Sequence, residues 1–105
     1  MNGSAKAWVN FNGSGTVAIL DSMNTASITD ESTGSYAANY TNAMSNTFAA
    51  KFYSCDGNNS TNYARIGTMA GPASASSAKV RTHLASNSTL ADMVRVNITV
   101  NGDLA

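Results

Sequence analysis

The chain has 105 residues, six basic and six acidic, so its formal net charge is zero and only 11% of its residues are charged. One domain is expected at this length. Proteins that bind nucleic acid need a basic surface to displace counterions from phosphates, and membrane-surface modules need a polybasic patch. The charge balance therefore argues against both kinds of partner. No apolar stretch approaches the roughly 18 residues of a span inserted in a membrane.

Asn, Ser and Thr supply 38 residues, whereas strong helix formers other than Ala are scarce, with one Glu, four Leu and no Gln. Residues that favour turns and strands therefore dominate the chain. Eight aromatic residues are spread along a chain of zero net charge, and this combination argues against disorder. The composition predicts an all-β protein with a neutral surface rich in hydroxyl and amide groups.

Alternation of apolar and polar residues predicts eight short strands and no helix longer than one turn. The first strand has Phe11 on its apolar face and Trp8 on the other face, and the second places Ile19 and Met23 together on one face. Between these strands, Asn12-Gly13 is a strong signal for a tight hairpin turn, because both residues tolerate positive φ. The expected strands span residues 5–11, 16–23, 26–29, 35–41, 47–55, 63–70, 78–85 and 92–100.

Strands at roughly ten-residue spacing predict an antiparallel β-sandwich of jelly-roll type, with residues 1–105 as a single domain. Its core is expected to be thin, because many inward positions are Ala, Thr or Ser. Three large side chains, Trp8, Tyr53 and Met93, lie opposite the more apolar faces of their strands. We therefore predict a subunit interface that contains these three residues and covers a second face.

His83 and Cys55 are the only histidine and the only cysteine. A lone cysteine excludes an intrachain disulfide and a zinc site built from cysteines. His83 shares a strand face with Lys79 and Arg81 and has no carboxylate nearby in sequence to orient it. Cys55 has no helix start or nucleophile elbow that would lower its pKa. We expect structural roles for both residues, no catalytic residue and no enzymatic activity.

The six carboxylates mostly lie beside turns, where Asp commonly bonds its own backbone, so a catalytic pair of the glycosidase kind is disfavoured. The segment 56–60 alternates oxygen ligands as a calcium loop does. However, Thr61 and Gly67 occupy the positions where such a loop has Gly and Glu. A solvated loop is favoured, and we expect no metal site and no cofactor.

The tyrosines Tyr36, Tyr40, Tyr53 and Tyr63 are of a type that stacks on sugar rings, because tyrosine offers a flat surface and a hydroxyl group. Packing in the core or in a subunit interface is the favoured alternative.

Two long stretches carry a resemblance to one family. They are AKAWVNFNGSGTVAILDS at residues 5–22 and SITDESTGSYAANYTNAM at residues 27–44, with weaker matches in VRT at residues 80–82 and VRVNITV at residues 94–100. The chain resembles a small β-rich domain of bacteriophage tail fibres and related virion structural proteins, of the marine phage and cyanophage type. It departs from that family at Ser45, where Pro is usual, and at Phe48, where Tyr is usual. Residues 54–78 show no match and would form variable loops.

The resemblance implies a trimeric, non-enzymatic module of the virion, on the particle surface or the tail. We expect a tail-fibre or receptor-binding domain that contacts the host cell surface, with other virion proteins and a bacterial surface glycan as candidate partners. A capsid decoration or capsid-fibre protein is the alternative, and a cell-wall or polysaccharide hydrolase is less favoured. The candidate host-contact residues lie in the variable region and are Asp56, Asn58, Asn59, Asn62 and Tyr63.

Overall fold

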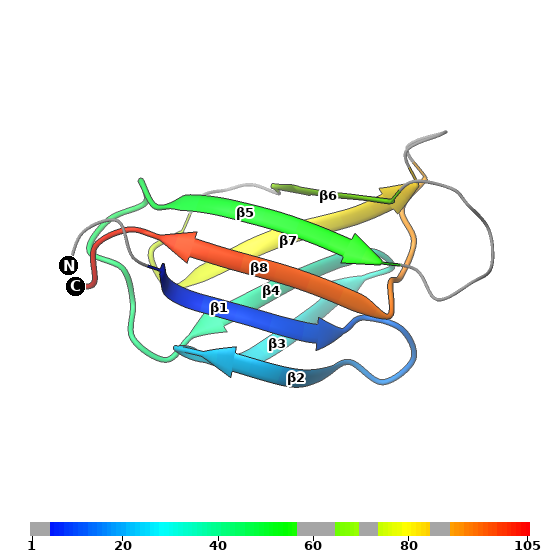
Figure 1. Ribbon diagram of the computed structural model, residues 1–105, viewed down its shortest axis with the longest axis horizontal. Coiled ribbons are helices and arrows are strands. Elements are labelled where there is room, and N and C mark those ends of the chain that lie inside the picture. The colour runs from blue at the N-terminus through cyan, green and yellow to red at the C-terminus, as the bar shows by residue number, and fades with distance from the viewer. Residues whose placement is uncertain (1–4, 57–64, 70–73, 85–88) are drawn as a thin grey trace.

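The computed structural model describes residues 5–56, 65–69, 74–84 and 89–105, and these ranges contain eight strands and no helix (Figure 1). The all-β prediction is therefore confirmed, and each strand overlaps a predicted one. The strands are β1 (Ala5–Asn12), β2 (Ala18–Met23), β3 (Thr25–Ser32), β4 (Ser35–Tyr40), β5 (Ala50–Asp56), β6 (Arg65–Met69), β7 (Ser77–Leu84) and β8 (Arg95–Asn101).

The strands form two sheets of four that face each other as a β-sandwich, which confirms the predicted architecture (Figure 1). The first sheet has the order β2-β1-β8-β5 and the second has the order β3-β4-β7-β6. Every neighbouring pair is antiparallel. The chain changes sheets between β2 and β3, β4 and β5, β5 and β6, and β7 and β8.

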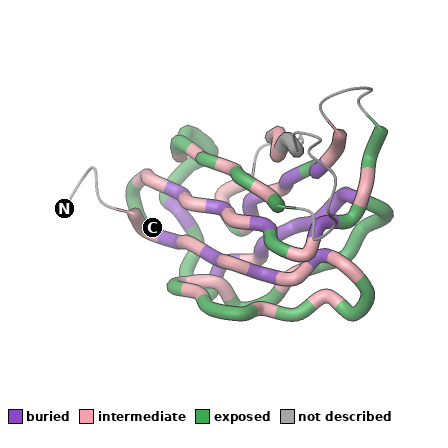
Figure 2. The backbone as a smooth tube through the Cα atoms, turned by 45° about the vertical axis from the view of Figure 1, so that its right-hand side comes forward, coloured by how far each residue is buried: buried purple, intermediate pink, exposed green. Residues whose placement is uncertain are grey.

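The core lies between the sheets and comes mainly from the central strands. Buried residues alternate with less buried ones along β1 and β8, as a strand with one covered face requires (Figure 2). Phe11 of β1 packs edge-on against Tyr36 of β4, with their ring centroids 5.2 Å apart. The buried cluster comprises Ala7, Val9, Phe11, Tyr36, Ala38, Tyr40, Met44, Ala78, Val80, Met93, Val96, Ile98 and Val100.

The hairpin between β1 and β2 is present, but the expected tight Asn-Gly turn is not. Asn12 pairs with Ala18, so five residues separate the strands, and the positive φ of 66° falls on Gly15. Gly13 instead turns toward the core, where its N–H donates a 2.8 Å hydrogen bond to the Met93 carbonyl. The contact of Gly13 with the core, rather than a requirement for positive φ in a tight turn, determines the position of this residue.

A β-bulge changes which residues of β2 face outward. Trp8 pairs with Met23, but Phe11 pairs with Ile19, because the register shifts and leaves Leu20 as the extra residue. Ile19 therefore packs against the core, while Met23 lies beside Trp8 on the outer face. The prediction that Ile19 and Met23 share a face is wrong for this reason.

Two further predictions of side-chain direction are also wrong. Met93 is only 1% exposed, because β8 begins at Arg95 and the alternation of that strand does not extend back to it. Tyr53 pairs with Ile98, which faces the core, so Tyr53 is directed inward and its neighbour Phe52 is exposed. A face shared by Trp8, Tyr53 and Met93 therefore does not exist on the single chain.

Candidate binding face

The outer face of the first sheet carries three large apolar side chains in one row, from Met23, Trp8 and Phe52, with Thr99 between Trp8 and Phe52. The register aligns Met23 of β2 with Trp8 of β1, Trp8 with Thr99 of β8, and Thr99 with Phe52 of β5. These four residues lie on the side of the sheet opposite the core. We call them the apolar row. Directly opposed side chains on adjacent strands lie close enough to form a single surface.

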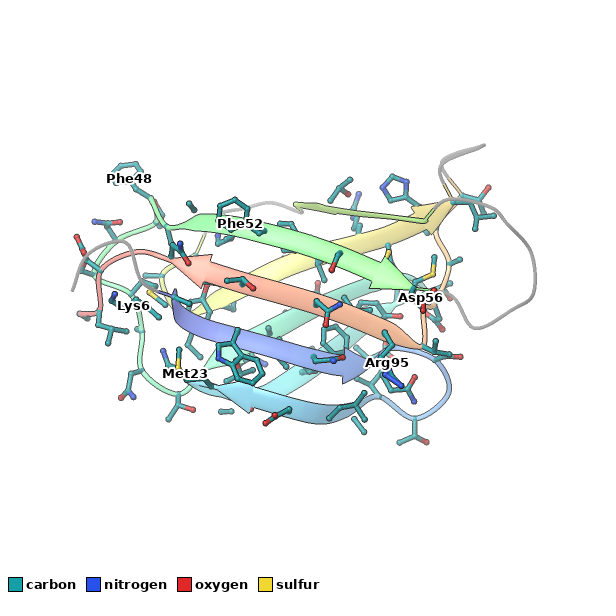
Figure 3. All side chains as sticks on the ribbon, viewed as in Figure 1. Lys6, Met23, Phe48, Phe52, Asp56 and Arg95 are labelled. Atoms are coloured by element: carbon teal, nitrogen blue, oxygen red, sulfur yellow. The ribbon has the colours of Figure 1, made fainter. Side chains whose placement is uncertain are left out.

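The apolar row is open to solvent on the single chain. Phe52 is 59% exposed and Met23 is 39% exposed, while Trp8 is partly buried between its neighbours. Phe48, in the segment before β5, is 87% exposed and lies at the same end of the molecule as Phe52 (Figure 3). Exposed apolar groups on one face are typical of surfaces that take part in interactions.

A polar row follows the apolar row along the strands. Asp21, Asn10, Asn97 and Ser54 are aligned across the sheet by the same registers. Asn97 Nδ2 donates a 3.1 Å hydrogen bond to Ser54 Oγ. Asn10 Oδ1 is buried and has no hydrogen-bond partner among the described residues. The middle of the face is therefore rich in amide and hydroxyl groups.

A pocket of about 490 Å³ lies on this face, at the end opposite the apolar row. Asp56, the last residue of β5, pairs with Arg95, the first residue of β8, and both side chains are exposed. Figure 3 shows Asp56 and Arg95 at one end of the sheet, with Phe48, Phe52, Lys6 and Met23 toward the other end. The pocket is lined by Asn12, Leu20, Asp56, Val94 and Arg95.

The two charged side chains of this pocket, Arg95 and Asp56, do not form an ion pair with each other. Among the described residues, no ion pair or hydrogen bond engages the Arg95 guanidinium or the Asp56 carboxylate. The Asn12 amide is already used in the hairpin, since its Oδ1 accepts a 3.0 Å hydrogen bond from the Ser14 N–H. Leu20, turned outward at the bulge and 53% exposed, supplies an apolar wall.

The outer face of the second sheet differs in part, because several of its polar groups are paired, although Arg81 is exposed with no ion pair among the described residues and His83 Nδ1 is buried without a partner there. Lys79 Nζ lies 3.5 Å from Glu31 Oε2, and Asn39 Nδ2 donates hydrogen bonds of 3.1 Å to Ser27 Oγ and 2.9 Å to Thr29 Oγ1. The contacts of Asn39 form a hydrogen-bonded ladder on β3 and β4. The outer face of the first sheet is the candidate site, because it holds the pocket and the exposed Phe52 and Met23.

The predicted site residues fall in different places. Of the expected host-contact residues, Asp56 lies in the pocket, while Asn58, Asn59, Asn62 and Tyr63 lie outside the described residues. Of the expected interface residues, Trp8 lies on the outer face, and Tyr53 and Met93 do not. Arg95 and Leu20 line the pocket but were not among the predicted site residues. The alternation of β8 places Arg95 outward, but the bulge at Leu20 leaves no signal in the sequence.

His83 and Cys55 are not brought together. His83 lies on the outer face of the second sheet, where its Nε2 is 3.2 Å from Thr68 Oγ1, whereas Cys55 is directed inward from β5 of the first sheet. No group of three or more His, Cys, Asp or Glu that could hold a metal ion occurs among the described residues.

The tyrosines that the structure describes belong to the interior. Burial raises the pKa of Tyr40 to about 12, and burial with the nearby Tyr40 raises the pKa of Tyr53 to about 12. The hydroxyls of both residues are buried without a hydrogen-bond partner in the described part of the chain. Tyr36 is fully buried. These three tyrosines therefore pack in the interior rather than stack on sugar rings.

Comparison of the chain with family models, with curated proteins and with solved structures finds no significant match. In the described ranges, no helix is long and apolar enough to cross a membrane.

Proposed function

We propose that this chain is a structural module of a bacteriophage virion, a homotrimeric tail-fibre or receptor-binding domain that contacts the host cell surface. The observation that carries the proposal is the polarity of the outer face, which is apolar at one end and carries unpaired charged groups at the other. The sequence resemblance supplies the phage assignment and the number three. The geometry supplies two surfaces, one suited to assembly and one suited to recognition.

The apolar row and Phe48 form the assembly surface in this proposal. Removing apolar surface from water contributes roughly 25 cal/mol per Å², so covering Phe48, Phe52 and Met23 would add to the stability that a small core provides. In a ring with threefold symmetry each chain makes two contacts, which increases the covered area without requiring one large interface. Neighbouring copies or other virion proteins would cover this end.

The pocket end forms the recognition surface. Asp56 begins the segment in which the host-contact residues are expected, and that segment follows directly from β5. The end of a sheet that carries a pocket is a typical place for binding residues, because a rigid scaffold positions them. Assembly through one end would present several copies of the other end to a cell.

Binding to bacterial cells tests this proposal. The labelled protein is incubated with a panel of marine bacterial strains that includes cyanobacteria, and the cell-associated fraction is measured against protein concentration. We expect saturable binding to at least one strain. Binding should weaken in Phe52→Ser, because lower valency reduces avidity. Lys79→Asn, on the other sheet, is the control and should bind like the wild type.

Absence of binding to every strain would contradict the receptor-binding role. Detection of the chain on the capsid of purified particles, together with that absence, would favour a capsid decoration protein instead. Release of sugars from host polysaccharide would favour a hydrolase.

A further inference from the structure

We propose that the pocket formed by Asn12, Leu20, Asp56, Val94 and Arg95 is a subsite for one residue of a neutral bacterial surface oligosaccharide. This inference rests on the proposed function and specifies the chemistry of its recognition surface. It concerns the end of the outer face opposite the apolar row.

The size and lining of the pocket suit a small polar ligand. Its volume of about 490 Å³ lies within the range of small-molecule sites, roughly 300–1,000 Å³. Leu20 and Val94 provide apolar contact for the C–H groups of a sugar ring, and Arg95 and Asp56 provide polar groups. A few polar groups on an apolar lining are the usual composition of such a site.

The pair of charges selects for a ligand that is neutral. Arg95 can only donate hydrogen bonds, and the Asp56 carboxylate can only accept them. The two residues lie opposite each other in the β5–β8 register, and neither has a partner among the described residues. Neighbouring hydroxyls of a sugar satisfy both at once, because one accepts from the guanidinium while the other donates to the carboxylate. A carboxylated or phosphorylated sugar would be attracted by Arg95 and repelled by Asp56, so the pair gives it no net electrostatic advantage over a neutral sugar.

The bulge in β2 has a direct consequence for this pocket. Without the register shift between Asn10 and Phe11, alternation would not place both Leu20 and Asp21 away from the core. The shift turns Leu20 outward and leaves it 53% exposed beside the charged pair. Bulges often redirect a side chain beside a functional site, and this one completes the pocket wall.

The ligand can extend beyond the pocket along the sheet. The polar row of Asp21, Asn10, Asn97 and Ser54 lies next in the direction of the strands, between the pocket and the apolar row. A short oligosaccharide with one residue in the pocket would lie against these amide and hydroxyl groups.

An array of purified bacterial surface oligosaccharides, with neutral and acidic members, tests the inference. The wild type should be retained by neutral members. Arg95→Ala and Asp56→Asn should each lower the affinity for those members roughly tenfold or more, because each removes a charge-assisted hydrogen bond. The matched controls are Lys79→Ala and Glu31→Gln on the second sheet, which should stay within about twofold of the wild type. Thermal denaturation checks that every variant is folded.

Equal affinity of the wild type and both pocket variants for neutral members would overturn the inference. Preference for acidic members, with tighter binding by Asp56→Asn, would assign the pocket to an anionic ligand and overturn it as well. If the wild type binds cells but no oligosaccharide, the pocket inference fails and the proposed function stands. If it binds neither, both fail.

Discussion

Tyr36 and Asp92 join three separate backbone segments at one end of the sandwich. The Tyr36 hydroxyl lies 2.6 Å from the Gly13 carbonyl oxygen and 2.7 Å from Asp92 Oδ1, and Asp92 Oδ1 also accepts a 2.8 Å hydrogen bond from the Gly34 N–H. Burial, followed by the hydrogen bond to Asp92, raises the pKa of Tyr36 well above its usual range. This cluster fixes the hairpin that leads into the bulge, and therefore supports the pocket.

Substitution of Gly13 tests the importance of this cluster. A Cβ at Gly13 would lie 2.7 Å from the Tyr36 hydroxyl oxygen and 3.0 Å from the Met93 carbonyl oxygen. We expect Gly13→Ala to lower the free energy of unfolding by about 1–3 kcal/mol, because well-packed sites do not accept an added methyl group. Gly15→Asn is the control, since Gly15 has open space around it and Asn tolerates positive φ. Equal stability of the two variants in urea denaturation would contradict this view.

The raised pKa values of Tyr40 and Tyr53 predict that the folded chain loses stability at high pH. An ordinary tyrosine has a pKa of 10.0, whereas these two have pKa values of about 12 in the folded chain. Between these values the unfolded chain has released protons that the folded chain retains, so stability falls as the pH rises from about 10 to about 12. Below pH 10 their contribution is fully present. The denaturation midpoint, measured against pH, should show this fall.

The double variant Tyr40→Phe/Tyr53→Phe isolates the effect of these two hydroxyls. It should lose less stability over the same pH interval. At neutral pH it should be at least as stable as the wild type, because each substitution removes a buried hydroxyl that has no partner in the described structure. Identical pH profiles would show that these groups do not cause the alkaline loss.

At the scale of elements, the corner between β2 and β3 is one of the four connections that join the two sheets. Asn24 has a φ of 54°, and its Nδ2 donates 3.0 Å hydrogen bonds to the carbonyls of Lys6 and Asn42. Its Oδ1 accepts a 2.6 Å hydrogen bond from the Asn42 N–H. One side chain therefore holds β1, the corner and the segment after β4 together.

Two substitutions separate the conformational role of Asn24 from its hydrogen bonds. Asn24→Gly keeps access to positive φ and loses the hydrogen bonds, and we expect it to cost about 1–2 kcal/mol. Asn24→Ala loses both and should cost about 2–4 kcal/mol. Calorimetry that ranks the two variants in the reverse order would contradict this division of roles.

At the scale of elements, the sequence predicts the positions of the strands well and the directions of their side chains less well. Burial alternates clearly along β1, β5, β7 and β8, where Val96, Ile98 and Val100 are buried as their pattern requires, but not along β2, β3 or β4, although all eight strands lie where strands were predicted. The side-chain directions of Met23 and Met93 were predicted wrongly, because the phase of the alternation is lost at a bulge or beyond the end of a strand. Asp56 was singled out as a candidate site residue. Its partner Arg95 depends on the pairing of β5 with β8, which local sequence does not encode.

In the proposed function, the whole molecule presents an assembly surface and a recognition surface at opposite ends of one face. For a homotrimer, light scattering on a sizing column should give about three times the 10.8 kDa chain mass. Trp8→Asp and Phe48→Ser should lower that mass. Phe48 is 87% exposed, so its substitution should not affect folding of the single chain. Lys79→Asn, which changes the charge of the other sheet, should leave the mass unchanged. A wild-type protein that stays a stable monomer would contradict the prediction of a homotrimer.

The position and orientation of the chain in the purified phage particle test the central proposal most directly. A cryo-electron microscopy map of the particle should place the module at the tail or particle surface. Phe48, Phe52 and Met23 should lie against neighbouring copies, and Arg95 and Asp56 should face outward. Absence of the chain from the particle, or a map in which the pocket is covered by other virion proteins and the apolar row faces solvent, would contradict the proposal.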